Sequence, residues 1–344
     1  MNKLETKPKQ VVKKFLSVLP ERARDVLTGR FGLGKETDRH TLEKIGQKYG
    51  ITRERVRQIE NYAVASIKKS DVFQKERPVF NELRALIDQL GGVIAEEDLL
   101  EHVSPKDKGL QNHIHFLMVL GDEFVKEKED ENFKHRWHID EGLSKRVHEA
   151  LSKLYKNLTS KDLVSELDII ATFLGHVEEV AVHHKDPEVV KRWLNISKVI
   201  GKNQLGEWGL STSPNVKAKG MRDYAFLVIR KHGSPIHFRE VAKAIEKIFG
   251  RKAHVATTHN ELIKDPRFVL VGRGLYALTE WGYASGVVKD VIKSILQKNG
   301  PLTKDKIVEK VLKERYVKEN TIIVNLQNPS HFKKNSDGTY SVKK

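Results

Sequence analysis

Apolar residues recur at helical spacing along most of this chain. Within residues 11–31, Val12, Phe15 and Leu19 fall on one stripe, and Pro20 starts a second helical stretch because its fixed φ suits a first helical position. Glycine and proline interrupt such stripes at intervals, and short apolar segments beside turn residues indicate small β-hairpins. The pattern predicts a mainly helical protein.

Residues 41–60 predict two short helices joined by a tight turn. Thr41 and Thr52 can each cap the start of a helix. Gly50 stands between them, and glycine adopts the positive φ that a sharp turn requires. Two helices joined in this way form a helix-turn-helix. The apolar positions that would face its core are Leu42, Ile45, Gly46, Val56 and Ile59.

The first turns of the second helix carry side chains suited to reading DNA bases. Arginine can donate two hydrogen bonds to guanine, glutamate can accept one from cytosine, and glutamine can pair with adenine. In a helix-turn-helix this part of the second helix meets the bases in the major groove. The residues concerned are Arg53, Glu54, Arg57 and Gln58. A solvated charged helix face explains the same run equally well, because charge runs are usually solvated.

After residue 69 the chain loosely repeats one layout four times. Each block has a helix, a short extended segment, two further helices and a β-pair that ends in an aromatic residue. This is the winged-helix layout, in which we expect the aromatic to close the wing onto the core. The alternative is a coincidence among ordinary α+β segments. The apolar residues before the second helices are Ile94, Leu158, Ile236 and Leu302, and the closing aromatics are Trp137, Trp208, Tyr276 and Tyr340.

These patterns predict a mainly α fold with small β-wings, in which an N-terminal helix-turn-helix domain is followed by tandem winged-helix domains. We expect linkers at Ser211–Gly220 and Gly282–Gly286, which are rich in small and turn-forming residues. The helix-turn-helix domain is placed at 11–70, and four segments follow, which we call the first to fourth modules. The first module, at 76–141, is an acidic winged helix, and the second, at 144–210, is winged-helix-like. The third module, at 220–281, is a winged helix, and the fourth, at 286–344, is a basic winged helix.

Charge is distributed unevenly along the 344 residues, whose formal net charge is +16. Residues 1–70 hold 17 basic and 8 acidic side chains, and residues 215–344 hold 26 and 12. Residues 71–140 are acidic, with 9 basic and 16 acidic side chains. A basic domain gains affinity for nucleic acid by releasing counterions from phosphates, whereas an acidic domain is repelled. We therefore expect contacts with double-stranded DNA at the two ends of the chain.

Several function classes receive no support from the sequence. The segment Gly29–Lys35 spells GxxxxGK, but a helix is predicted before it and Glu36 takes the Ser or Thr position of a phosphate loop. The histidine pairs lack the i, i+4 spacing and nearby carboxylate of a helical zinc site. Neither a GxSxG nor a CxxC motif is present. We expect no enzyme activity, no catalytic residues, no cofactor and no metal.

The location expected for the protein is the cytoplasm. The chain has no cysteine, which is consistent with a reducing compartment. The segment MNKLETKPKQ at its N-terminus is charged, and the apolar region of a signal peptide does not follow it. No run approaches the roughly 20 apolar residues of a membrane span, so a membrane is not an expected partner.

The stretch RFGL at Arg30–Leu33 and the stretch TLEKIGQKYGITRERVRQIE at Thr41–Glu60 resemble region 4 of the housekeeping-type bacterial sigma factors. The resemblance covers residues 16–69. It implies a bacterial, nucleoid-associated protein. It also implies recognition of a −35-like promoter element and contact with the β flap of the RNA polymerase core. By this resemblance Arg53, Glu54, Arg57 and Gln58 read bases, and the DNA backbone is contacted by Arg22, Arg30, Thr41, Leu42 and Arg55.

The chain departs from the sigma pattern in two respects. Tyr62 stands where that family usually has a basic phosphate contact, which implies a lower affinity for the DNA backbone. The chain also has no aromatic-rich segment that resembles sigma region 2, the part that melts the −10 element. We therefore expect a protein that reads duplex DNA without being a complete sigma factor.

A second resemblance lies in the third module. Arg222–Thr279, with SPIHFREVAKAI and DPRFVLVGRGLYALT, looks like a HARE-HTH domain, a winged helix found in the delta subunit of Gram-positive RNA polymerase. Two functions follow from the resemblances together. The first is a sequence-specific DNA-binding transcription protein, and the alternative is an RNA polymerase-associated, delta-like adaptor that binds the core enzyme rather than acting mainly through DNA.

Overall fold

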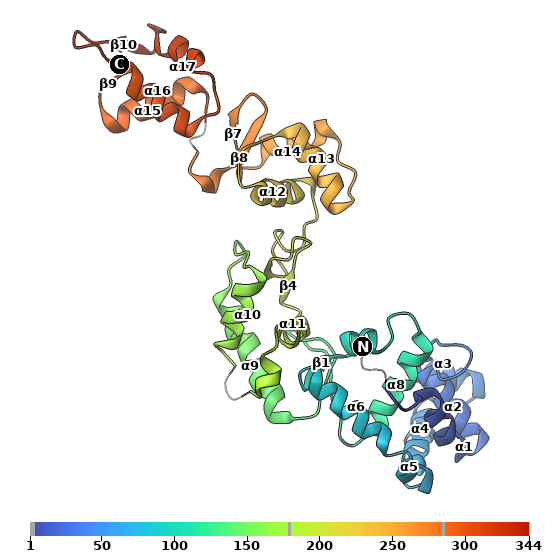
Figure 1. The fold of residues 1–344 in the computed structure, drawn as a ribbon. Coiled ribbons are helices and arrows are strands. Elements are labelled where there is room, and N and C mark those ends of the chain that lie inside the picture. Colours follow the sequence, from blue (N-terminus) through green and yellow to red (C-terminus); the bar gives the residue numbers. More distant parts are fainter. Residues whose placement is uncertain (1–3, 178–179, 284–285, 344) are drawn as a thin grey trace. The chain divides into compact units, whose positions relative to one another are not determined.

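The computed structural model describes residues 4–177, 180–283 and 286–343. Most of these residues are helical, and the strands form small antiparallel sheets, as the sequence predicts. The chain divides into two compact units, one of residues 1–202 with 208–211 and one of residues 203–207 with 212–344. Figure 1 shows the elements of both units. Among the described residues, no helix is both long and apolar enough to span a bilayer.

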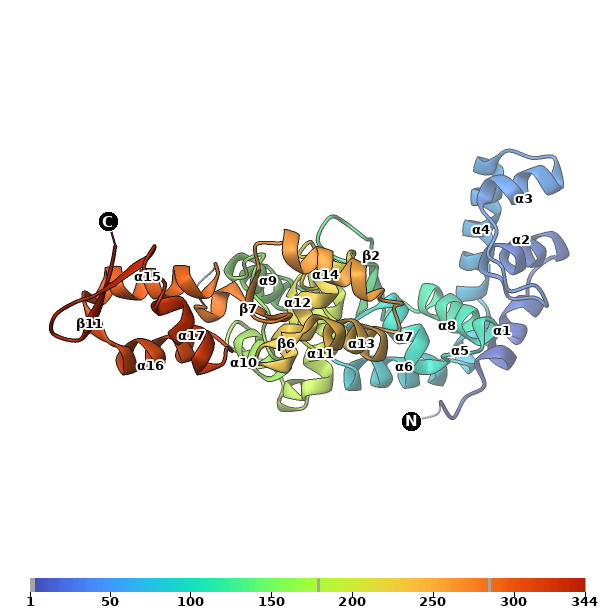
Figure 2. The same ribbon diagram turned by 90° about the horizontal axis from the view of Figure 1, so that it is seen from above.

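Four helices begin the chain, namely α1 (Pro8–Ser17), α2 (Glu21–Phe31), α3 (Leu42–Tyr49) and α4 (Arg53–Lys68). Helices α2, α3 and α4 lie side by side (Figure 2). They enclose a small core of Val26, Ile45 and Val56, which are at most 3% exposed. The predicted helix-turn-helix of residues 41–60 is therefore present as α3 and α4.

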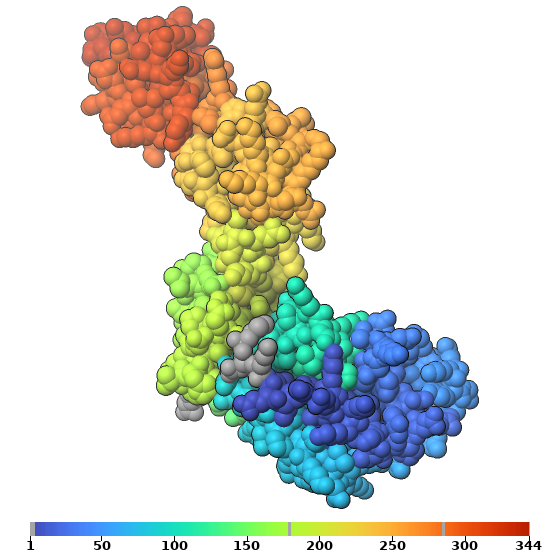
Figure 3. Space-filling view, turned by 45° about the vertical axis from the view of Figure 1, so that its right-hand side comes forward, coloured from blue at the N-terminus to red at the C-terminus, as the bar shows by residue number. Residues whose placement is uncertain are grey.

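A larger core joins these helices to the first module. Phe15 of α1 stacks on Phe80 at a ring-centroid distance of 6.3 Å, and Phe31 of α2 lies 4.9 Å from Phe116. All four rings belong to one buried cluster. In the space-filling view the corresponding parts of the chain are in direct contact (Figure 3). Because the core is shared, the helix-turn-helix domain and the first module are held rigidly together.

The first module consists of three helices and three strands in the predicted order, preceded by the short helix α5 (Asp71–Lys75). Strand β3 lies between β1 and β2 in an antiparallel sheet. Pro78 occupies the first position of α6, where its missing N–H has no helical partner to lose. The elements are α6 (Pro78–Gln89), β1 (Val93–Ala95), α7 (Glu96–Val103), α8 (Lys108–Leu120), β2 (Val125–Glu127) and β3 (Arg136–His138).

The second module differs from its predicted layout. Leu158 has an extended backbone at the end of α9 and precedes α10, as predicted, but Val164 rather than Leu158 forms an isolated bridge with Trp208. Helix α9 runs to Asn157, so Leu158 directly follows it, and the pairing with Trp208 is made further along the chain. The elements are α9 (Glu141–Asn157), α10 (Glu166–Leu174), η1 (Val182–Lys185), α11 (Pro187–Ile196), β4 (Ile200–Lys202) and β5 (Trp208–Leu210).

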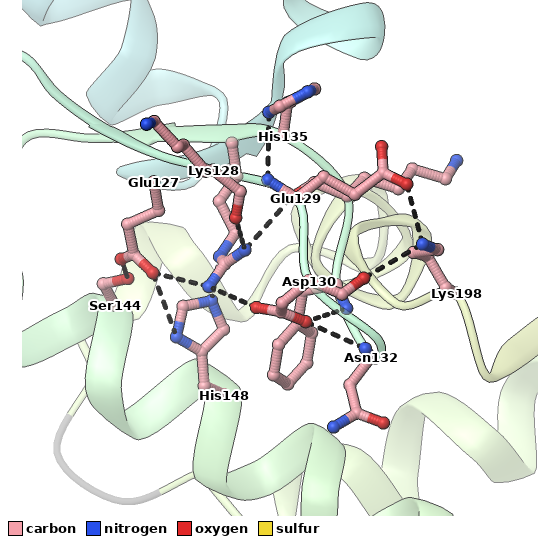
Figure 4. A network of polar contacts seen from close by, with 12 residues as sticks. Glu127, Lys128, Glu129, Asp130, Asn132, His135, Ser144, His148 and Lys198 are labelled. Carbon is pink, nitrogen blue, oxygen red and sulfur yellow. Dashed lines mark hydrogen bonds and ion pairs between the residues drawn. The ribbon is translucent and has the colours of Figure 1, made fainter.

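The β2–β3 hairpin of the first module is fastened to the second module by a polar network (Figure 4). Arg136, which is 5% exposed, donates to Glu127 at 2.6 Å and to Nε2 of His148 at 2.7 Å. Lys198 donates through Nζ to Glu129 at 2.7 Å and through its backbone N–H to the carbonyl of Asn132 at 2.7 Å. The β2–β3 hairpin is therefore bonded to the second module both near its strands and near its turn.

The third and fourth modules each have a three-stranded antiparallel sheet with the last strand in the centre. The fourth module has its own core around Ile292, Ile307 and Ile322. The third module contains α12 (Met221–His232), β6 (Ile236–His237), α13 (Phe238–Phe249), α14 (Val255–Lys264), β7 (Phe268–Gly272), β8 (Leu275–Leu278) and η2 (Thr279–Trp281). The fourth contains α15 (Val288–Asn299), β9 (Leu302–Thr303), α16 (Lys304–Glu314), α17 (Glu319–Leu326), β10 (Phe332–Lys334) and β11 (Thr339–Val342).

The segment predicted as a linker at Ser211–Gly220 is a series of packed turns. Ser213, Asn215 and Val216 are at most 7% exposed. The side-chain amide of Asn203 donates to the backbone carbonyl of Asn215 at 3.2 Å. The predicted linker is thus packed rather than extended, and the boundary between the two compact units falls within it, between Ser211 and Thr212. Residues 284–285 of the predicted second linker lie outside the described residues.

Candidate nucleic-acid interface

The turn between α3 and α4 is defined by two threonine caps and two glycines. The Oγ1 atoms of Thr41 and Thr52 accept hydrogen bonds from backbone N–H groups three residues on, at 3.1 and 3.2 Å. Gly50 has φ of 61°, a value that favours glycine. A Cβ on Gly46 would lie 2.6 Å from the carbonyl oxygen of Ile51, so the close approach of helix and turn requires glycine there as well. The predicted caps and turn are confirmed.

All four predicted base-reading residues lie exposed on the first turns of α4. Arg57 donates two hydrogen bonds to Glu54, at 2.6 and 3.0 Å, and Arg55 donates one to Oε1 of Gln58 at 2.9 Å. The hydrogen bonds from Arg57 hold the pKa of Glu54 below its ordinary value. Glu54 is thus an ionised acceptor at neutral pH, and a DNA base has to compete with Arg57 for it.

The predicted backbone contacts fall into two groups. Arg22 is exposed, with its guanidinium carbon 5.7 Å from the centre of the Tyr49 ring, and Arg55 is exposed on α4. Arg30 is half-buried, donates to the carbonyl of His40 at 3.2 Å and lies 3.5 Å from Glu60. Arg30 therefore has a structural task within the domain besides any contact with phosphate.

The last two predicted backbone contacts, Thr41 and Leu42, stand at the start of α3. The hydroxyl of Thr41 is occupied as the helix cap, although the residue itself is exposed. Leu42 is partly buried against the core of Val26, Ile45 and Val56, which leaves chiefly its backbone N–H to face a phosphate. Backbone N–H groups at a helix N-terminus suit an anion, because they have no partner within the helix.

One residue that sequence reasoning missed holds the loop before the helix-turn-helix. Asn112 of α8 is 2% exposed, and its amide donates to the carbonyls of Gly32 at 3.0 Å and Thr37 at 2.7 Å. Its oxygen accepts a hydrogen bond from Arg39 at 2.8 Å. Asn112 thus uses its donors and its acceptor on one loop. No local sequence signal marks this role, since Asn112 lies 80 residues from Gly32.

The GxxxxGK segment does not have the setting of a phosphate loop. Gly29 lies inside α2, and Gly32 ends that helix with φ of 63°. The next helix, α3, begins only at Leu42. In a phosphate loop a strand precedes the glycines and a helix follows the lysine directly. The segment serves here as the loop that Asn112 holds.

Seven lysines of the fourth module lie on its first two helices, three on α15 and four on α16. Helix α17 has the sequence ENTIIVNL, with neither lysine nor arginine. Helices α15 and α16 carry Lys289, Lys293, Lys304 and Lys306, which are exposed. These two helices therefore carry much of the positive charge of this module.

Comparison with known proteins finds matches to the N-terminal part of this chain. Residues 15–69 match the family model of sigma-70 region 4. Residues 15–69 form a sigma-70 region 4 domain. The chain is also similar to the RNA polymerase sigma factor RpoD of Neisseria gonorrhoeae, with 44% identity over 59 residues. Those residues are 17% of this chain and 9% of that relative.

The region 4 domain comprises α2, α3, α4 and the end of α1. Its family is a non-enzymatic transcription domain that binds DNA and the RNA polymerase core, so the N-terminal prediction is confirmed at that level. The match stops at residue 69 and leaves the four modules outside it. The HARE-HTH resemblance of Arg222–Thr279 stays a prediction.

Proposed function

We propose that this chain is a sequence-specific DNA-binding transcription protein whose region 4 domain reads a −35-like promoter element. In this proposal Arg53, Glu54, Arg57 and Gln58 contact bases in the major groove. The observation that carries it is the exposed polar face on the first turns of a capped second helix, in a domain of a DNA-binding family. Helix α4 presents its apolar face to the domain core, which leaves the reading face outward.

The DNA backbone is held in this proposal by Arg22, Arg30, Thr41, Leu42 and Arg55. The four modules are tandem winged helices, of which the third resembles HARE-HTH domains and the basic fourth module adds phosphate contacts. The shared helix–strand–helix–helix–hairpin order and the central position of the last strand in three modules support this interpretation. Since the chain has no segment that resembles sigma region 2, we propose that it binds duplex DNA without melting it.

The test is a selection of binding sites from random duplexes, followed by affinity measurements on the selected duplex and a scrambled one. Arg53→Ala and Gln58→Ala are each expected to reduce the difference between the two duplexes by about 1–3 kcal/mol, because each loses a base contact. Lys13→Ala, an exposed cationic change on α1, serves as the matched control and should leave that difference unchanged. Equal losses on both duplexes for Arg53→Ala would contradict base reading.

The alternative function is a delta-like adaptor that binds the RNA polymerase core through its region 4 domain, at the β flap. One observation favours it. The acidic first module shares its hydrophobic core with the region 4 domain, so negative charge is fixed beside the DNA-reading helix. Purified bacterial core polymerase decides between the two. Retention of the chain on core polymerase together with weak, nonselective DNA binding would favour the adaptor.

A further inference from the structure

Three side chains that can bind a metal ion meet where α6 of the first module approaches η1 of the second. Asp88 belongs to α6, and its partner His184 on η1 lies 96 residues away along the chain. One carboxylate oxygen of Asp88 is 3.4 Å from Nε2 of His183, and the other is 3.3 Å from Nε2 of His184. The ligand atoms of all three residues lie within 4.8 Å of one another.

These separations suit a cation better than they suit direct ion pairs. Charge-assisted hydrogen bonds between nitrogen and oxygen are about 2.7–2.9 Å long, which is shorter than both contacts. A tetrahedral zinc ion with bonds of about 2.0–2.1 Å has neighbouring ligand atoms about 3.3–3.4 Å apart. Each histidine nitrogen therefore lies about one tetrahedral edge from an oxygen of Asp88, with His183 nearest one carboxylate oxygen and His184 nearest the other.

His184 is held in place by its surroundings. Its side chain is 7% exposed, and its ring lies edge-on to Trp193 with the centroids 5.9 Å apart. Trp193 is fixed in turn by a hydrogen bond of 3.0 Å to the carbonyl of Gly91. Nε2 of His184 also donates to the backbone carbonyl of Asp88 at 3.0 Å, and a cation would replace that proton. The ring thus already points its nitrogen toward Asp88.

The other two groups are open to solvent, so an ion can reach them. The side chains of His183 and Asp88 are 57% and 49% exposed. A groove beside them is lined by further polar side chains, including His102, Asp186 and Glu188. Three protein ligands leave a fourth position of a tetrahedral ion for water.

We propose that Asp88, His183 and His184 bind one divalent cation of the zinc class. Two imidazole nitrogens and one carboxylate oxygen form a donor set that suits Zn²⁺ and Co²⁺ better than the all-oxygen preference of Mg²⁺ or Ca²⁺. Because the ligands come from two modules, the bound ion fastens η1 to α6 and stabilises the second module against the first. The proposal does not depend on the DNA-reading function of α4.

The experiment uses the full chain without an affinity tag, treated with a chelator and dialysed. Titration with ZnCl2 in a calorimeter is expected to show one ion per chain, and CoCl2 is expected to give the visible absorption of a low-symmetry, roughly tetrahedral cobalt site. Asp88→Asn and His183→Ala should each weaken zinc binding by at least about tenfold, since each removes a ligand. His102→Ala changes a histidine of the same groove outside the three ligands and should bind zinc as the unchanged chain does.

Thermal unfolding gives an independent measurement. Zinc should raise the unfolding temperature of the unchanged chain and of His102→Ala, because a ligand that binds only the folded state stabilises it. It should not do so for Asp88→Asn. The proposal is overturned by the absence of saturable zinc or cobalt binding, or by undiminished binding in both Asp88→Asn and His183→Ala. Circular dichroism of both variants establishes that they are folded before binding is compared.

Discussion

Ile94 lies directly opposite Trp137 across strands β1 and β3. The same relationship recurs in the third module, where Ile236 faces Tyr276, and in the fourth, where Leu302 faces Tyr340. In each case the apolar residue precedes the second helix and the aromatic residue lies in the last strand. The aligned positions of the repeat are therefore cross-strand partners, which is the contact that stabilises a small sheet.

The second module reaches a similar pairing by another residue. There Trp208 faces Val164, with mutual backbone hydrogen bonds of 2.8 Å, and Leu158 is not the partner. The closing aromatic lies in the last strand of all four modules, whereas the aligned apolar residue is its cross-strand partner in three of them. Aromatic residues are the more reliable marker because they bury more area and tolerate fewer positions.

Two fully buried tryptophans of the second module are expected to respond differently to the same change. Nε1 of Trp193 donates to the carbonyl of Gly91 at 3.0 Å, whereas Nε1 of Trp208 has no hydrogen-bond partner within the described part of the chain. Trp193→Phe should therefore lower the free energy of unfolding by about 1 kcal/mol more than Trp208→Phe does. Urea denaturation of the two variants measures the difference, and equal losses would show that the hydrogen bond contributes nothing.

Asn112 is expected to stabilise the loop that precedes the helix-turn-helix. Asn112→Ala removes three hydrogen bonds and leaves the carbonyls of Gly32 and Thr37 without this donor, so the free energy of unfolding should fall by about 1–3 kcal/mol. Asn81→Ala is the control, because Asn81 is an exposed asparagine of α6 in the same unit. A loss for Asn112→Ala no larger than that of the control would rule out the proposed role.

The network at the β2–β3 hairpin should make stability depend on pH. Burial, together with Arg136, lowers the pKa of His148 to about 4, while an unfolded histidine titrates near 6.5. Between these two pH values the unfolded chain therefore binds more protons than the folded chain does. The contribution of His148 to the free energy of unfolding is fully present above about pH 6.5 and is lost as the pH falls toward 4. The same network includes His138, Glu127 and Asp130. The pKa of Glu127 is also lowered, so its protonation reduces the free energy of unfolding only at more acidic pH.

The variant His148→Gln isolates this contribution. Glutamine can still accept the hydrogen bond from Arg136 but does not titrate. Between pH 7 and pH 5 the unchanged chain should lose on the order of 1 kcal/mol more stability than His148→Gln, after allowance for solvent screening. Urea denaturation at the two pH values measures it. Parallel losses in both proteins would assign the pH dependence to other groups.

The fourth module is expected to contribute affinity without sequence preference. Replacing Lys289, Lys293 and Lys304 by alanine should weaken binding to matched and scrambled duplexes alike. The slope of log K against log salt should become less steep by about 0.9 for each phosphate contact that is lost. Lys75→Ala, an exposed change beside the acidic module, should leave the slope unchanged. An unchanged slope in the triple variant would place the DNA contacts elsewhere.

Local sequence patterns were sufficient for the helix-turn-helix. Thr41 and Thr52 act as caps and Gly50 makes the turn, because caps and positive φ depend on groups only a few residues apart. The same holds for the exposure of Arg53 and Gln58, which follows from their place on α4 opposite the apolar stripe. These features are determined by neighbours along the chain.

The tertiary structure decided what distant residues do to one another. Asn112 reaches a loop 80 residues away, and Asp88 meets His184 across 96 residues, yet neither residue stands in a recognisable motif. The sequence by itself determined the helices, the turn, the hairpins and the likeness to region 4, since these depend on spacing and local backbone preference. The contacts between side chains of different modules depend on how the buried surfaces pack against one another. The spacing of apolar residues along the chain does not predict that packing.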